Sequence, residues 1–191
     1  MLREAGRRGF RPMYRVVRSW NGVHRCPYGR SRRGAIGARV TDEEELGTVA
    51  KSIIDSNRYM TLATADGNGQ PWASPVWYAP AGYRAFLWVS SPEAQHSRNL
   101  AIRPQVSIVI FDSHQPGGWH AVYMSAVAEE VVGTDVDGGI EIFSRRSEAQ
   151  GMPAWTRADV VAPARHRLYR ATASEHFVLD PHDQRLPVSL V

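Results

Sequence analysis

Two adjacent serines, Ser90 and Ser91, stand where a predicted strand meets a predicted helix, and both are well suited to bind an anion. The first N–H groups of a helix have no partner within it and form the positive end of its dipole. Serine hydroxyls add donors that can rotate toward a ligand. His96 and Arg98 follow on the first turns of the helix and can add positive charge. The junction is typical of a phosphate site, although Ser91 would also serve as a simple N-cap before Pro92.

Aromatic side chains are concentrated on two adjacent predicted strands. Five of them fall within seventeen positions: Trp72, Trp77, Tyr78, Tyr83 and Trp88. Such rings can wall a pocket for a planar heterocycle. They are also normal strand residues that bury a large area in a core. The sequence leaves both interpretations open.

Other residue patterns exclude several classes of chemistry. The seven histidines show no His-x-x-x-His spacing and the chain has one cysteine, so no metal site is expected. No Gly-x-Gly-x-x-Gly, phosphate-loop or Gly-x-Ser-x-Gly motif occurs, which argues against a nucleophilic hydrolase and the common nucleotide sites. Glu129 and Glu130 point to opposite faces of a predicted strand and cannot act as an acid–base pair. These patterns identify no catalytic residue.

The elements that would position these residues begin with a helix. Residues 41–44 (TDEE) form a capping box, and the apolar residues after them recur with helical spacing until about Asn57. Residues 59–65 and 70–79 are rich in β-formers and flank the turn sequence DGNG, which predicts a β-hairpin. A third strand over 83–89 would complete a meander of three consecutive strands.

The rest of the chain alternates helices and strands. We expect a helix over 92–102, strands over 105–111 and 119–132, a helix over 134–150 and a last strand over 166–179. Strands in hairpin order favour an antiparallel sheet, and six of them close or nearly close into a barrel that removes their edges. The predicted fold is therefore mainly β, a six-stranded antiparallel β-barrel with short flanking helices.

Charge divides the 191 residues into two parts of opposite sign. Residues 1–39 contain eleven arginines and one acid, Glu4, whereas residues 40–191 contain twelve basic and eighteen acidic residues. The first part has no sustained hydrophobic period and carries Gly or Pro every few residues, which is typical of disorder. We expect an Arg-rich disordered leader over 1–39 and one folded domain over 40–191.

The leader admits several interpretations. Arg7 and Arg8 superficially match a twin-arginine export signal, but no apolar region follows them. An organellar transit peptide, an RNA-binding arm, a dispensable solvated tail and a misassigned start near Val40 all fit its composition. Because the folded domain is acidic, nucleic acid is expected as a partner only through the leader.

Composition also bears on cellular location. No stretch approaches the ~18 apolar residues that a membrane helix needs, so no membrane insertion is expected. A lone cysteine, Cys26, cannot close an intrachain disulfide, and the fold therefore does not depend on an oxidising compartment. These two observations predict a cytoplasmic protein.

Five segments of the chain match a known pattern. They are YMTLATADGNGQPWASPVWY (59–78), FLWVSS (86–91), HSRNLAIRPQVSIVIF (96–111), HAVYMSAVAEEV (120–131) and LYRATASEHFVLD (168–180). The third is similar to a family pattern Lys-x-x-Asn-Leu-x-x-x-Pro-x-Val-Ser. Together they resemble the pyridoxamine 5′-phosphate oxidase-like FMN-binding split-barrel family. The resemblance implies a split barrel, and an oxidoreductase that acts on a small-molecule substrate as a homodimer with FMN at the subunit interface.

The resemblance also implies a set of cofactor-binding residues: Ser74, Val76, Trp77, Ser90, Ser91, Gln95, His96, Trp119 and His120. The first three would lie along the isoalloxazine ring and ribityl chain, the second and third of them through their backbone. The next four would bind the phosphate, and the last two would reach across from the other subunit. The implied phosphate site coincides with the anion site that the residues themselves predict.

Departures from the family pattern keep other functions open. The family commonly has Lys or Arg where this chain has His96, and a neutral imidazole is a weaker phosphate partner than an ammonium group. The oxidase proper has basic residues near the positions of Ser74 and Ala79. The groups with which it grips pyridoxamine phosphate are not recognisable, so oxidation of vitamin B6 is not expected.

Two alternatives to an FMN enzyme follow. A reductase on the same fold could use the deazaflavin coenzyme, whose longer anionic tail needs a basic groove that Arg84, Arg98 and Arg103 could supply. The predominance of arginine over lysine suggests a GC-rich genome, which is compatible with deazaflavin users. The other alternative is a non-enzymatic flavin- or haem-binding module.

Overall fold

The computed structural model describes residues 43–112, 121–179 and 184–190. The leader predicted over 1–39, the predicted capping residue Thr41 and the predicted cofactor residues Trp119 and His120 lie outside these ranges. Within the described ranges, every helix is too short or too polar to cross a lipid bilayer.

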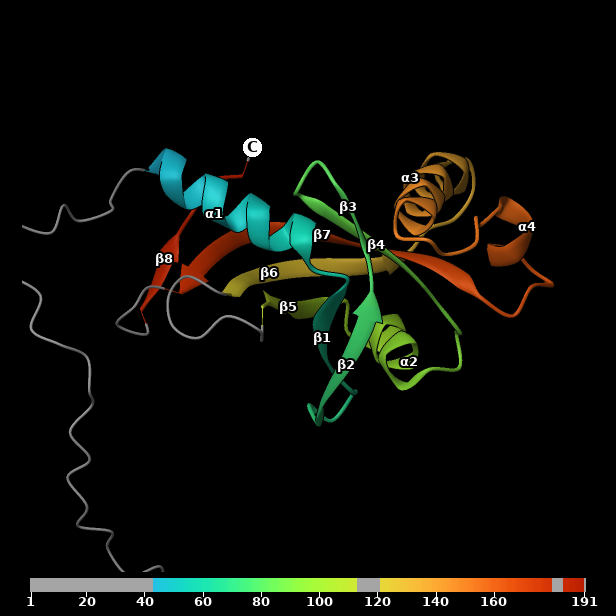
Figure 1. The fold of residues 1–191 in the computed structure, drawn as a ribbon. Helices are drawn as coiled ribbons and strands as arrows, with labels where there is room; N and C mark the ends of the chain where they lie inside the picture. Colours follow the sequence, from blue (N-terminus) through green and yellow to red (C-terminus); the bar gives the residue numbers. More distant parts are fainter. Residues whose placement is uncertain (1–42, 113–120, 180–183, 191) are drawn as a thin grey trace, which may run out of the picture. The chain divides into compact units, whose positions relative to one another are not determined.

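Eight strands and four helices form the described chain (Figure 1). The strands are β1 (Tyr59–Ala65), β2 (Pro71–Trp77), β3 (Ala79–Ala81), β4 (Ala85–Ser90), β5 (Gln105–Phe111), β6 (Ala121–Glu130), β7 (Arg167–Leu179) and β8 (Arg185–Pro187). The helices are α1 (Glu43–Ser56), α2 (Gln95–Ile102), α3 (Asp135–Ala149) and α4 (Arg157–Val160).

The mainly β, antiparallel fold is confirmed, but the described chain has eight strands where six were predicted. The two additional strands, β3 and β8, have three residues each. Three residues are too few to show the alternating pattern by which a strand is identified in a sequence. Pro80 in the middle of β3 also reads as a turn residue rather than a strand residue.

The strand order makes the sheet curl into a barrel. The order is β2-β1-β5-β6-β7-β4-β3, with β8 paired to β7, and all pairs are antiparallel. β2 and β3 therefore stand at opposite ends of the order although only Tyr78 separates them in the chain. The two ends of the sheet must approach each other to allow this connection. The predicted meander is wrong, because the strand after the hairpin pairs with β3 and β7 instead of β2.

The hairpin of β1 and β2 is closed by the turn sequence that predicted it. The Asp66 carboxylate accepts hydrogen bonds from the backbone N–H of Asn68 and of Gln70, at 2.8 and 2.9 Å. Gly69 has a φ of 85°, a conformation that glycine adopts without steric cost. The turn fixes the register of the hairpin, in which Leu62 stands opposite Ser74.

One hydrophobic core fills the barrel and a second lies under α3. The first includes α1 residues such as Ile54 and fully buried strand residues such as Leu62 and Ile108. The second joins Phe143 of α3 to Leu87 and Leu168 of β4 and β7. α3 and α4 lie near one end of the sheet in Figure 1, whereas α1 lies near the end where β8 is found. The barrel interior and the α3 layer are therefore separate packing units.

The junction between β4 and α2 differs from its prediction. A helix starting at Pro92 with Ser91 as N-cap was expected, but α2 starts at Gln95 and Ala94 occupies the N-cap position without a side-chain cap. Ser91 instead closes a turn: its Oγ accepts from Glu93 N and its carbonyl accepts from Ala94 N, both over 3.1 Å. The hydroxyl satisfies a turn N–H and so delays the helix by three residues.

Candidate functional site

Ser74, Ser90 and His96 come from three different elements and meet in one place. The His96 ring of α2 bridges β2 and β4, with Nδ1 3.2 Å from Ser74 Oγ and Nε2 2.9 Å from Ser90 Oγ. Trp72 of β2 extends the chain, because its Nε1 donates to Ser74 Oγ over 3.0 Å. These four residues are the serine–histidine cluster. The structure thus brings together three of the residues that the sequence predicted for cofactor binding.

A second set of hydrogen bonds, the asparagine arm, ties α2 to the same hairpin. Gln95 Nε2 donates to Asn99 Oδ1 over 2.8 Å, and Asn99 Nδ2 donates to Thr64 Oγ1 over 3.0 Å. Thr64 Oγ1 in turn donates to the Trp72 carbonyl over 3.3 Å. Asn99 and Thr64 are buried, and satisfied buried polar groups hold the elements that carry them in one arrangement. Neither residue was assigned a role from the sequence, although Asn99 stands at the Asn of the family pattern Lys-x-x-Asn-Leu.

Burial decides the protonation state of His96. The residue is 8% exposed, and its burial lowers the pKa of the imidazole from the ordinary value of 6.5. The ring is therefore neutral at pH 7, with one nitrogen donating and the other accepting. His96 does not supply the positive charge that the sequence allowed for. It links two serine hydroxyls instead.

The turn that carries Ser91 adds further donors to the site. The Ser91 hydroxyl accepts one bond within the turn and keeps its own hydrogen for a ligand. Glu93 on the same turn would repel an anion, but its carboxylate is paired with Arg98 at 3.3 Å. Both side chains of that pair are exposed, so the pair offsets charge and contributes little to stability.

The donor set as a whole fits an oxyanion. The first N–H groups of α2 have no partner within the helix, and the hydroxyls of Ser90 and Ser91 stand beside them. All of these donors are neutral, so an anion at this site would be held by hydrogen bonds and by the helix dipole instead of by a fixed cation. A phosphate group of a cofactor is compatible with this set. In the part of the chain that the structure describes, no group of His, Cys, Asp or Glu is arranged to hold a metal ion.

Val76 and Trp77 follow Ser74 on β2, and their side chains pack on opposite faces of the strand, Val76 in the barrel core and Trp77 against α3. Val76 is buried in the barrel core. The Trp77 indole donates to Gln150 Oε1 over 2.8 Å and meets the Phe143 ring edge-on at 4.7 Å between centroids. Both side chains are engaged in packing, and the resemblance implies a ligand contact for these two residues through their backbone.

The five aromatic residues of the central strands divide between the two interpretations left open. Tyr78 and Trp88 are fully buried, and Trp88 stacks on Tyr169 at 5.5 Å, so both belong to the core. The Tyr83 hydroxyl donates to Asp55 on α1, away from the serine–histidine cluster. Trp72 alone among the five is both largely exposed, at 51%, and hydrogen-bonded to the cluster. It is the aromatic residue best placed to contact a ligand ring.

The outer sheet face, on β1, β2, β5 and β6, is built from uncharged side chains and bordered by charged ones: the Arg185 guanidinium lies 4.3 Å from the centroid of the Tyr123 ring, and Glu175 of β7 is paired with Ser125. Side chains on these strands alternate between buried and exposed, and the strand register brings the exposed or half-buried ones to the same face. Eight residues on four strands share it: Thr61, Ala63, Ala73, Pro75, Ser107, Val109, Tyr123 and Ser125. They are small, hydroxyl-bearing or apolar. A broad face of this kind on strands is typical of a protein–protein contact.

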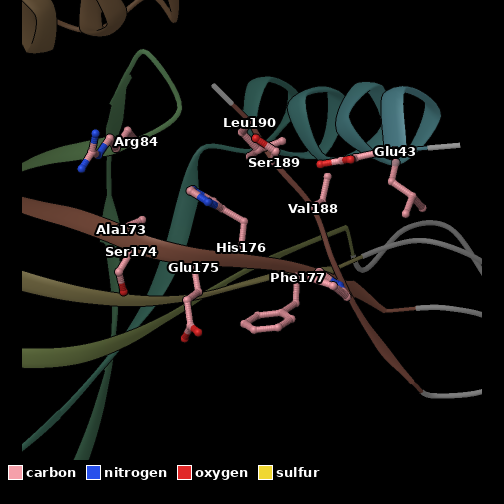
Figure 2. Close-up of a pocket in the computed structure, with 12 residues that line it drawn as sticks. Glu43, Arg84, Ala173, Ser174, Glu175, His176, Phe177, Val188, Ser189 and Leu190 are labelled. Carbon is pink, nitrogen blue, oxygen red and sulfur yellow. The ribbon is translucent and has the colours of Figure 1, made fainter. Parts of the chain in front are cut away.

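A separate groove of about 630 Å³ lies between α1, β7 and residues 187–190 (Figure 2). Arg84 lines it at the start of β4, whereas Ser90 ends the same strand, about 20 Å away at the rise of a β-strand. Figure 2 shows the His176 ring and the Glu175 side chain on opposite sides of β7. The His176 Nε2 donates to the Tyr83 carbonyl over 2.9 Å. Of the predicted cofactor residues that the structure describes, none lines this groove.

Comparison with known proteins places the fold and the site in context. Residues 46–180 match the family model described as pyridoxamine 5′-phosphate oxidase. A relative from Polynucleobacter asymbioticus, named pyridoxine/pyridoxamine 5′-phosphate oxidase, is 33% identical over 100 residues, covering 50% of this chain and 43% of the relative. The chain spans about half the length of the curated relatives that it matches.

Two solved structures share the fold at low sequence identity. A haem-binding protein from Mycobacterium smegmatis aligns with a TM-score of 0.61 and 22% identity over 76% of this chain and 58% of its own. HutZ from Vibrio cholerae, described as a haem storage protein, aligns with a TM-score of 0.56 and 20% identity over 73% of this chain and 99% of its own. With the family model matching more than half of its length, the chain belongs to the pyridoxamine 5′-phosphate oxidase family.

Proposed function

We propose that the protein is an FMN-dependent oxidoreductase that acts on a small-molecule substrate. The observation that carries the proposal is the convergence of Ser74, Ser90 and His96 from three elements, next to the turn of Ser91. Family membership supports flavin binding in general. The neutral donor set supports a phosphate ligand in particular, because phosphate oxygens accept several hydrogen bonds at once.

Each predicted residue has a distinct proposed role. Ser90 and Ser91 donate to the phosphate together with the first N–H groups of α2. Gln95 donates one amide hydrogen to Asn99, and its second amide hydrogen would be a further phosphate donor. The backbone of Val76 and Trp77 runs along the isoalloxazine ring. The roles of Trp119 and His120 from a second subunit stay predictions, because both residues lie outside the described ranges.

The bound flavin would supply hydride chemistry, and the protein would supply position and exclusion of water. The serine–histidine cluster and the asparagine arm fix where the phosphate can sit. The exposed indole of Trp72 would cover one side of the ring. No acid–base residue is assigned, since a flavin reaction does not require one from the protein.

A homodimer is part of the proposal. The eight side chains of the outer sheet face are themselves uncharged, and a second copy of the chain is the partner that the family resemblance implies for it. An interface on these strands would place β2 of each copy at the seam. The cytoplasmic location and the nucleic-acid role of the leader remain predictions.

A cofactor titration tests the proposed function against its alternatives. The full-length protein is titrated separately with FMN, the deazaflavin coenzyme and haem, and binding is followed by absorption and fluorescence. We expect FMN to bind most tightly and the bound flavin to be reducible. Preference for the deazaflavin coenzyme would favour a deazaflavin-dependent reductase. The basic groove expected for that coenzyme lacks one of its three arginines, because Arg84 lines the distant groove and does not join Arg98 and Arg103. Haem binding without flavin binding would favour the non-enzymatic module.

A further inference from the structure

We propose that His96 is a positioning residue that turns the hydroxyl hydrogen of Ser90 outward, so that Ser90 donates to a bound phosphate. The inference rests on the proposed function, because it concerns how the same site holds the phosphate of the cofactor. The continuous hydrogen-bond chain from Trp72 through Ser74 and His96 to Ser90 carries it.

Trp72 sets the direction of this chain at one end. An indole nitrogen can only donate, so Trp72 Nε1 gives its hydrogen to Ser74 Oγ. Ser74 can then donate its own hydrogen to His96 Nδ1, which leaves Nε2–H to donate to Ser90 Oγ. In this arrangement every hydrogen within the chain has an acceptor. The hydroxyl hydrogen of Ser90 is the one left over.

The opposite tautomer of His96 leaves the hydroxyl hydrogen of the buried Ser74 without an acceptor. With the proton on Nδ1, Ser74 Oγ would accept two bonds, its own hydrogen would have no acceptor within the chain, and Ser90 would donate inward to Nε2. Ser74 is 8% exposed, whereas Ser90 is half-buried at the end of β4. A buried hydrogen without an acceptor is costly, while a more exposed one can bond to water or to a ligand. The Nε2–H tautomer is therefore favoured.

The protonation state of the ring is consistent with this choice. Burial lowers the pKa of His96, so a single ring hydrogen is present at pH 7 and the two nitrogens have different roles. A fully ionised phosphate group has no hydrogen of its own, so at neutral pH its oxygens accept hydrogen bonds and donate none. Ser90 binds such a group with its hydrogen outward and repels it with its lone pairs outward. His96 thus determines whether Ser90 is a phosphate donor.

Two substitutions at position 96 separate positioning from simple packing. The amide of glutamine reaches as far as Nε2 and can donate to Ser90, whereas the shorter amide of asparagine reaches only the Nδ1 position near Ser74. Affinity is measured for FMN and for riboflavin, which lacks the phosphate. We expect His96→Asn to lower the FMN-to-riboflavin affinity ratio about ten-fold or more, as for the loss of a hydrogen bond to a charged group. His96→Gln should keep most of the ratio.

Ser90→Ala is the matched control for this pair. It should lower the ratio as much as His96→Asn does, and the double variant should lower it no further, because the two residues act through one hydrogen bond. Equal ratios for His96→Asn and His96→Gln, or additive losses in the double variant, would overturn the proposal. A structural role alone would weaken FMN and riboflavin binding together and leave the ratio unchanged.

A measurement on the unsubstituted protein keeps the inference independent of variant folding. The ¹⁵N chemical shifts of the His96 ring report which nitrogen carries the hydrogen, with or without a ligand. We expect Nε2 protonated and Nδ1 unprotonated at pH 7, and protonated Nδ1 would overturn the proposal. If the protein does not prefer FMN over riboflavin, the proposed phosphate site fails, while the ring shifts still decide whether His96 directs Ser90.

Discussion

In the unfolded chain, the His96 ring forms hydrogen bonds with water. In the folded chain, it forms them with two serine hydroxyls. A neutral ring makes this exchange at little cost, whereas an imidazolium would have to be buried with its charge. The pKa of His96 is lowered for that reason, and burial also lowers the pKa of His176. Both residues therefore couple the stability of the fold to pH.

Acid is expected to destabilise the protein through these two histidines. Above pH 6.5 the two histidines are neutral in the folded and the unfolded chain, so they do not make the free energy of unfolding depend on pH. Below pH 6.5 the unfolded chain takes up a proton first, so the free energy of unfolding falls until the pH passes below the lowered folded pKa. Urea unfolding at a series of pH values measures this decline, and His96→Gln should make it shallower. A variant with the same pH dependence as the unsubstituted protein would contradict this account.

The candidate site could be predicted in part at the residue scale. Ser90 and Ser91 were identifiable because hydroxyls before a helix are a local signal that needs no tertiary contact. The pairing of Ser74 with His96 was not, because it joins residues twenty-two positions apart across two elements. Asn99 and Thr64 were missed for the same reason, since their partnership exists only once α2 packs on the hairpin.

Within α3, two adjacent glycines show how closely a helix approaches the sheet. A Cβ added at Gly139 would lie 2.8 Å from Leu168 Cδ2, and Leu168 is fully buried in β7. A Cβ added at Gly138 would meet nothing within 4 Å. A side chain at position 139 would therefore have to displace the Leu168 methyl group, whereas Gly138 only costs helix propensity.

These glycines give a matched pair of variants. We expect Gly138→Ala to raise the free energy of unfolding by about 1 kcal/mol, because alanine is the better helix former. Gly139→Ala should instead lower it by about 1 kcal/mol, because overpacking against Leu168 outweighs the same gain. Denaturant unfolding of the two variants compares them directly. Equal stabilisation by both substitutions would show that α3 does not press on β7 as described.

Elements were predicted well where their signals are local and long. The hairpin turn at Asp66 and the amphipathic face of α1 depend on neighbours in sequence, and both were predicted close to their observed positions. The start of α2 was predicted three residues early, because a serine before a proline resembles an N-cap whether or not a turn intervenes. The separation of β2 from β4 could not be predicted, since strand order is set by the whole barrel.

The curled sheet has a broad outer face of uncharged side chains on four strands. Residues such as Ser107, Val109 and Ser125 are on this outer sheet face, while Ile108 and Met124 between them fill the core. A broad face of small, hydroxyl-bearing or apolar side chains is typical of a surface that binds another protein. In the proposed dimer it would position the two cofactor sites at the seam.

A charge placed on the outer sheet face should therefore break the dimer. Ser107→Arg introduces two like charges near the proposed two-fold contact, and we expect a monomer in sedimentation experiments together with at least ten-fold weaker FMN binding. Ala149→Arg on the exposed side of α3 is the control and should leave both properties unchanged. A dimer that persists with Ser107→Arg would place the interface elsewhere.

The most direct measurement of the central claim is a crystal structure of the full-length protein grown with FMN. We expect two copies joined through the outer sheet face, with the phosphate of FMN within hydrogen-bond distance of the Ser90 and Ser91 hydroxyls. FMN bound in the groove beside His176, or bound by a single copy with the junction of β4 and α2 left without ligand, would contradict it.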